Sequence, residues 1–172
     1  MASTPRVGSF LPLIGAGCTT LVLGSIPSIA SLDATQYYAH PRNAFWPIMA
    51  TVFGFARSAP YADRCAALLQ SHVALWDVLR ECERRGSLDS AIVDATSEVN
   101  DFACLFASYP GIHTVIFNGA KAADTFKRRV ASAVDTDARK FVRMPSTSPA
   151  HASLTLADKL EKWREVLDPS PV

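Results

Sequence analysis

"CTTLVLGSI", residues 18–26, is the stretch that decides the fold class. Leu, Val, Thr and Ile dominate this short run, and Gly24 and Pro27 end it, which is the pattern of a buried β-strand. Three further runs of this kind follow, at residues 72–79, 112–119 and 139–146. The sequence therefore predicts strands that are buried on both faces, as in a parallel sheet.

Between the predicted strands, apolar residues recur at helical spacing. The clearest stripe lies near the C-terminus and consists of Leu156, Leu160, Trp163 and Leu167. Strands that alternate with helices predict an α/β protein, here a three-layer α/β/α sandwich with a four-stranded parallel sheet. A length of 172 residues suits one domain. We expect that domain to span residues 1–172, with its core at about 18–167.

The chain lacks the sequence features of a membrane or secreted protein. The N-terminal segment has a single Arg and a short apolar run broken by Pro12, which makes a poor secretory signal. No apolar run approaches the roughly 20 residues that cross a bilayer. The four cysteines are too widely spaced for a paired metal or redox motif: Cys18, Cys65, Cys82 and Cys104. We expect a monomer inside the cell (cytoplasm and nucleoid, or nucleus in a eukaryote), with reduced thiols, no metal, no cofactor and no membrane contact.

The net charge of +1 by itself indicates no partner, so nucleic-acid binding would need a local basic patch. Residues 119–143 contain seven basic side chains and only three acidic ones. This excess is compatible with a phosphate backbone, although a solvated helix face would have the same composition.

Ligands of open parallel sheets bind outside the carboxyl ends of the strands. The segments that follow the predicted strands are 24–46, 77–89, 118–121 and 145–151. Because they should meet at one edge of the sheet, we expect the site there. Asp77, also at a strand end, is expected to be structural and to cap the following turn.

The side chains of these segments suit a planar heterocycle. Tyr38 and Asn43 precede a predicted helix and have no core periodicity, whereas Phe45 and Trp46 fit the core face of that helix. Asn118 is able to donate and accept at once, which fits a base edge but equally an Asn-Gly turn. The hydroxyls of "MPSTSPAHA", residues 144–152, fit phosphates or an ordinary Ser/Pro loop.

Four stretches in this order resemble the uracil-DNA glycosylase superfamily, in particular its hypoxanthine-DNA glycosylases (DNA-deoxyinosine glycosylases). They are "LVLGSIPSIASLDATQYYAHPRNAFW", "ALWDVLRECERRGSLDSAI", "VIFNGAKA" and "MPSTSPAHA". The resemblance implies a monofunctional enzyme that hydrolyses the N-glycosidic bond of a deaminated base flipped out of DNA. Flipping is required because the reacting atom is inaccessible inside the stack.

The resemblance also implies the site residues. Many members place an Asp or Asn after the first strand to position the attacking water, but here that place holds Ile26, and Asn43 is expected to take over. His151 assists the departing base, and Tyr38 stacks on it. Asn118 contacts the base edge or supports the pocket, which the backbone of Gly24, Ser25 and Ile26 lines. The expected DNA-binding residues are Ser146, Thr147, Ser148, Pro149 and Ala150.

Two alternatives stay open at the level of sequence. The first is a uracil or mismatch-thymine DNA glycosylase on the same fold, since the preferred base among hypoxanthine, xanthine and uracil is undetermined. The second is a non-catalytic DNA-lesion or nucleotide-binding module, because the turn "GSIPS" lacks a side-chain acid.

Overall fold

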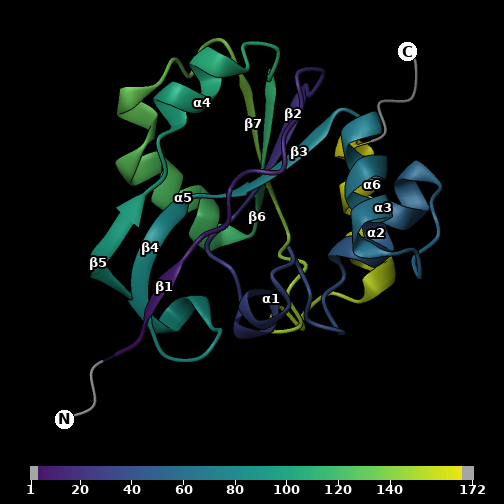
Figure 1. The fold of residues 1–172 in the computed structure, drawn as a ribbon, viewed down its shortest axis with the longest axis horizontal. Helices are drawn as coiled ribbons and strands as arrows, with labels where there is room; N and C mark the ends of the chain where they lie inside the picture. The colour runs from purple at the N-terminus through teal and green to yellow at the C-terminus, as the bar shows by residue number, and fades with distance from the viewer. Residues whose placement is uncertain (1–3, 168–172) are drawn as a thin grey trace.

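A computed structural model describes residues 4–167 of the chain. At its centre lies a sheet of four parallel strands (Figure 1). In spatial order the strands are β3 (Val73–Asp77), β2 (Thr20–Gly24), β6 (Thr114–Asn118) and β7 (Lys140–Met144). Each strand lies within one of the four apolar runs, so the predicted parallel sheet is confirmed.

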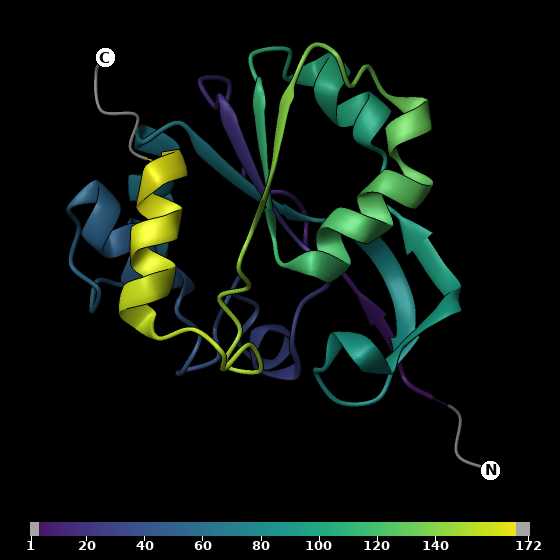
Figure 2. The same ribbon diagram turned by 180° about the vertical axis from the view of Figure 1, so that it is seen from behind.

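Helices cover both faces of this sheet, which confirms the three-layer architecture (Figures 1 and 2). One face carries α4 (Phe102–Ser108) and α5 (Ala120–Arg129). The other face carries α2 (Phe45–Phe53), α3 (Tyr61–Gln70) and α6 (Leu156–Leu167). No helix of the described residues is long and apolar enough to cross a membrane.

The strands contribute side chains to two cores, because successive side chains of a strand point to opposite faces of the sheet. In β2, Leu21 and Leu23 pack in the core beneath α4 and α5, together with Phe126. Val22 packs in the core beneath α2, α3 and α6, together with Trp163. All the strand residues named here are fully buried, which explains why the sequence showed continuous apolar runs rather than alternation.

A second, antiparallel sheet was not predicted. It consists of β1 (Arg6–Gly8), β4 (Leu79–Arg84) and β5 (Ile92–Val99), in the order β1-β4-β5. Its strands carry charged residues on the solvent side, so they form no apolar run. β4 begins one residue after β3 ends, and the sequence offers no turn signal there.

A short helix was also missed, α1 (Ile29–Ala34), which follows β2. Its N-terminus is capped by Ser28, whose Oγ accepts a hydrogen bond from the backbone N–H of Ser31 at 3.2 Å. With six residues, α1 is too short to show a helical period. It lies at the carboxyl edge of the parallel sheet, where the segments after the strands meet (Figure 1).

Candidate functional site

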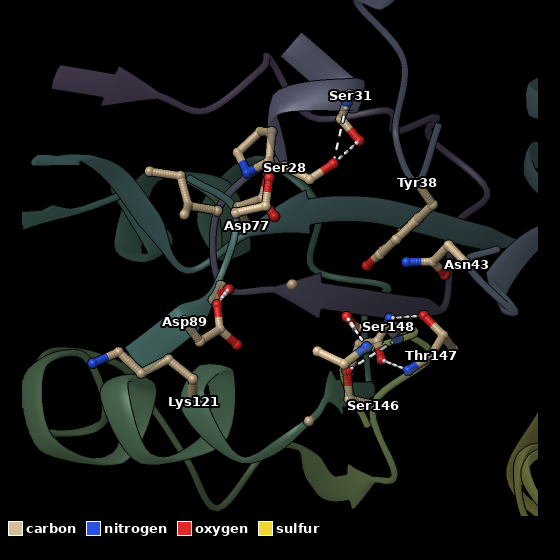
Figure 3. A pocket seen from close by; sticks show the side chains of 18 of the residues that line it. Ser28, Ser31, Tyr38, Asn43, Asp77, Asp89, Lys121, Ser146, Thr147 and Ser148 are labelled. Atoms are coloured by element: carbon tan, nitrogen blue, oxygen red, sulfur yellow. Dashed lines mark hydrogen bonds between the residues drawn. The ribbon is translucent and has the colours of Figure 1, made fainter. Parts of the chain in front are cut away.

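A pocket of about 500 Å³ opens at the carboxyl edge of the parallel sheet (Figure 3). All four segments that follow the strands contribute to its wall, among them Gly24, Asp77, Asn118 and Ser146. The prediction that these segments converge on one site is therefore confirmed. Gly24, Ser25 and Ile26 line the pocket as expected. The Ile26 side chain, 7% exposed, belongs to the small core beside the antiparallel sheet.

Gly24, the last residue of β2, lets two polar groups come close to the strand end. A Cβ atom at this position would lie 2.6 Å from Oδ1 of Asp77 and 3.3 Å from Oη of Tyr38. The first distance is impossible for real atoms, so a side chain here would displace the carboxylate. Glycine is thus required by the close approach of Asp77, which sequence analysis did not place in the site.

Tyr38 is held in an unusual conformation beside the pocket. Its φ of 56° lies in the left-handed region, which costs free energy for a bulky residue. Its ring stacks on Phe45 with a centroid distance of 4.0 Å, so only the opposite ring face is open to a base. The hydroxyl points into the pocket (Figure 3) and is buried, with no hydrogen bond of normal geometry among the described residues, although the Asn118 side chain is close enough to oppose the rise in its pKa. Burial raises the pKa of this phenol, so it stays protonated as a donor.

Asn43 stands at the mouth of the pocket, at the entry to α2. Its Oδ1 accepts a hydrogen bond from the backbone N–H of Phe45 at 2.9 Å, which forms an Asx turn. This bond fixes the side chain, and the amide nitrogen points into the pocket near Tyr38 (Figure 3). Asn43 therefore offers the pocket a pre-oriented N–H donor.

Asn118 clamps the loop after β7. Its Nδ2 donates to Oγ1 of Thr147 at 2.8 Å, and its Oδ1 accepts from the backbone N–H of Thr147 at 2.8 Å. Of the two expected roles for Asn118, the geometry favours support of the pocket. The expected DNA contact of Thr147 is wrong for its side chain. This residue is 0% exposed, and its hydroxyl accepts a hydrogen bond from Nδ2 of Asn118.

Ser146 and Ser148 stand on either side of this clamp, both half-buried on the pocket wall. The Oγ of Ser146 accepts from the backbone N–H of Ser148 at 3.2 Å. The Oγ of Ser148 accepts in turn from the backbone N–H of Ala150, also at 3.2 Å. Both hydroxyls act here as acceptors, and neither donates a hydrogen bond to another of residues 4–167, so each O–H is available to an anion.

Helix α6 braces this loop from behind. Nζ of Lys159 donates to the backbone carbonyl of Ser148 at 3.2 Å, and Nε1 of Trp163 donates to the carbonyl of Pro145 at 3.0 Å. Lys159 is only 4% exposed, and burial lowers its pKa. At the tip of the loop, Ala150 is exposed, and His151 reaches the rim of the pocket.

Gly119 allows the loop to approach the end of β6. Its φ of 102° and ψ of 172° are essentially restricted to glycine, and a Cβ here would lie 3.0 Å from Cβ of Ser146.

We expect Gly119→Ala to lower the free energy of unfolding by about 1–3 kcal/mol in urea titrations. Gly86→Ala is the matched control, because Gly86 also has a positive φ but no atom within 4 Å of a Cβ. Equal losses of unfolding free energy in both variants would show that the positive φ alone, and not the contact with Ser146, requires glycine at position 119.

Asp77 ends β3 at the pocket, only 4% exposed. Its Oδ2 has no hydrogen-bond partner in the part of the chain that the structure describes. Burial and, to a smaller extent, the charge of Asp89 raise its pKa to about 7, and Arg84 opposes this rise. The expected capping role is wrong, because the chain runs from β3 into β4 after one residue and leaves no turn to cap.

The basic segment 119–143 is not one free cationic face. Lys121, on the pocket wall, pairs with Asp94 at 2.6 Å and thereby lowers the pKa of that carboxyl. Arg129 donates to the backbone carbonyl of Ser97 at 2.6 Å, and the guanidinium of Arg139 stacks on Phe106. These three basic side chains therefore make contacts within the protein that stabilise the fold.

The chain is similar to two curated archaeal proteins. Both are named "Hypoxanthine DNA glycosylase". The protein of Methanosarcina barkeri is 36% identical over 116 residues, which cover 67% of this chain and 72% of the relative. The protein of Methanosarcina acetivorans is 37% identical over 105 residues, which cover 60% of this chain and 65% of the relative.

A solved structure shares the fold. The solution NMR structure of a candidate uracil DNA glycosylase from Methanosarcina acetivorans superimposes with a TM-score of 0.79, at 27% sequence identity. The match covers 95% of this chain and 97% of that protein. No protein-family model matches the chain.

Proposed function

The chain belongs to the hypoxanthine DNA glycosylases of the uracil-DNA glycosylase superfamily, and on this premise we propose how its pocket acts. The substrate is DNA that contains a deaminated base: hypoxanthine foremost, with xanthine and uracil as further candidates. The enzyme flips this base into the pocket and hydrolyses its N-glycosidic bond. One observation carries the proposal: a pocket large enough for a flipped nucleotide holds two buried polar groups that have no hydrogen-bond partner among residues 4–167, with an oriented amide at its mouth.

The loop after β7 is suited to hold the DNA backbone. The free O–H groups of Ser146 and Ser148 donate to phosphates that flank the lesion. The buried ammonium of Lys159 lies behind these serines and adds a favourable field for an anion. Pro149, Ala150 and His151 form the tip that fills the gap left in the stack.

The chemical step needs a water molecule at C1′ of the sugar. The glycosidic bond breaks largely before attack, so the water must be placed rather than deprotonated. The amide N–H of Asn43 donates to this water and leaves its second lone pair free to attack. As the C1′–O bond forms, the water loses one proton, and the departing anionic base takes it up. Tyr38 holds the departing base by stacking on it with the ring face that Phe45 leaves open. His151, at the rim, assists the departure of the base.

Water is favoured over a lysine nucleophile. Lys121 is the lysine on the pocket wall, and its ammonium is paired with Asp94. An amine nucleophile must be deprotonated, which this ion pair opposes. We therefore propose a monofunctional hydrolase. The residues that line the pocket come from one chain, which supports a monomer, and a DNA substrate supports a place inside the cell.

The deciding experiment is an excision assay on duplexes that contain deoxyinosine, deoxyxanthosine, deoxyuridine or a G·T mismatch. We expect hypoxanthine to be released fastest. Faster release of uracil or thymine would favour the other activity on this fold. Tight binding to the inosine duplex without base release would identify a non-catalytic lesion-binding module instead.

Tyr38 offers a test of base capture. We expect Tyr38→Ala to weaken capture of the flipped base by about tenfold, because base–aromatic stacking contributes roughly 1–3 kcal/mol. Single-turnover rates over a range of enzyme concentrations separate capture from chemistry. Tyr38→Phe, the matched control, keeps the ring and its stack on Phe45, so it should retain both capture and the chemical rate. Unchanged rates in Tyr38→Ala would remove this residue from the pocket.

A further inference from the structure

We propose that a groove beside the base pocket binds the phosphate backbone of the lesion strand, on one side of the flipped nucleotide. This inference rests on the proposed function of the pocket. The groove, of about 230 Å³, lies between the segment that leads into α2 and the loop that leads into α6. Asn43 and His151 line both the groove and the base pocket, so the two hollows meet at the mouth. A strand whose nucleotide enters the pocket is therefore positioned to continue over the groove.

The groove is lined by cations and by no acid. Arg42, Arg57 and Lys159 contribute to its wall, and none of its lining residues is an Asp or a Glu. Arg42 and Arg57 are exposed, and their guanidinium groups make no ion pair or hydrogen bond within residues 4–167. Asp158, which precedes Lys159 in the chain, accepts hydrogen bonds from the backbone N–H and the hydroxyl of Thr155 and does not line the groove. A concave surface with uncompensated positive charge attracts an anion.

Lys159 gives the groove a charge that is fixed in place. This residue is 4% exposed, and within residues 4–167 its Nζ donates one hydrogen bond, to the backbone carbonyl of Ser148 at 3.2 Å. An ammonium group has three N–H donors, so two remain for an anion or for water. Salt screens a buried charge less than an exposed one, so Lys159 supports a phosphate in the groove as well as one at the serine loop.

The apolar part of the lining fits a sugar–phosphate chain better than a free anion. Pro41, Pro149 and Leu154 line the same groove as the three cations. A nucleic-acid backbone alternates the apolar face of a sugar with a charge, whereas inorganic phosphate presents the charge alone. The groove also continues into a second hollow of about 260 Å³, which shares Arg57 and Leu156 with it. Such a continuous surface suits an extended chain.

The test is equilibrium binding to a duplex with one 2′-fluorinated, cleavage-resistant deoxyinosine, by fluorescence anisotropy over a series of KCl concentrations. We expect Arg42→Ala and Arg57→Ala each to weaken binding about tenfold at about 0.1 M KCl. Each should also reduce the slope of log affinity against log salt by about 1, because one phosphate contact is lost. Lys140→Ala, the matched control, removes one exposed charge at the amino end of β7, opposite the pocket, and should change neither quantity. Unchanged slopes in both arginine variants would overturn the proposal.

Duplexes with a single neutral methylphosphonate identify the phosphate that the groove holds. At one position of the lesion strand, the neutral linkage should weaken wild-type binding as Arg42→Ala does. The two changes together should then cost no more than either alone. The same result for a linkage in the complementary strand would overturn the assignment to the lesion strand. Equal weakening by Arg42→Ala on every duplex would also contradict the proposal, because no particular phosphate would then be bound.

A parallel assay on cleavable inosine duplexes separates this inference from the proposed function. Base release by the wild type, with undiminished binding by both arginine variants, would defeat the inference and leave the glycosylase activity standing. The expected losses of affinity and salt slope, without base release by the wild type, would do the reverse.

Discussion

Asn43→Ala is expected to slow the release of hypoxanthine from a deoxyinosine duplex by about 100-fold or more, the range for a positioned catalytic group. Ile26 occupies the place after β2 where the resemblance leads us to expect an Asp or Asn that positions the water, and it is packed in an apolar core. The amide of Asn43 is thus the pre-oriented donor at the mouth of the pocket. Single-turnover excision at saturating enzyme measures this step.

The control must separate a loss of the chemical step from a disturbance of the N-terminus of α2. Asn43 affects both, because its Oδ1 also accepts a hydrogen bond from the backbone N–H of Phe45. Asn43→Ser keeps a hydroxyl acceptor for that N–H but ends short of the pocket. We expect Asn43→Ser to be as slow as Asn43→Ala, yet to unfold near the wild-type temperature. Excision by Asn43→Ala within about tenfold of the wild type, or roughly 1.4 kcal/mol of barrier, would refute the water-orienting role.

Asp77→Asn is expected to stabilise the protein at pH 8. The folded-state pKa of about 7 lies above the ordinary value of 3.8, so the folded state binds the proton more tightly than the unfolded state. Wild-type stability therefore falls as pH rises between these values, and the full penalty applies above pH 7. This difference corresponds to at most about 4 kcal/mol, which the neutral amide removes.

Urea unfolding at pH 4 and pH 8 checks this prediction. The gain from Asp77→Asn should be large at pH 8 and small at pH 4, where the folded wild type is already protonated. Asp33→Asn serves as the control, since this carboxylate is exposed and should contribute little at either pH. A gain that is equal at both pH values would show that packing, not charge, limits stability at Asp77.

Asp77 lies at the carboxyl edge of the parallel sheet, and its buried carboxylate, whose Oδ2 has no partner among residues 4–167, costs stability. The strained φ of Tyr38 and the left-handed Gly119 lie at this same edge of the sheet. Local conformational preferences are thus overridden where the pocket is built, as is common at functional sites.

The sequence by itself determined the parallel sheet, its helices and the edge at which the site forms. Strands buried on both faces must be continuously apolar, so β2, β3, β6 and β7 were visible as runs. Asn43, Tyr38 and the serine loop were found because polar residues without core periodicity follow those strands.

Only the tertiary structure decided which of these residues are buried and which residues they contact. β4 has charged residues between its apolar ones, so it forms no apolar run. α1 has only six residues, which is too short to show a helical period. Thr147 and Asp77 were misjudged because burial and partners arise from residues far apart in the chain: Asn118 meets Thr147, and Gly24 meets Asp77. A carboxylate at a strand end is identical in sequence whether it caps a turn or lines a pocket. Its surroundings set its pKa and its hydrogen bonds, and only folding brings those surroundings together.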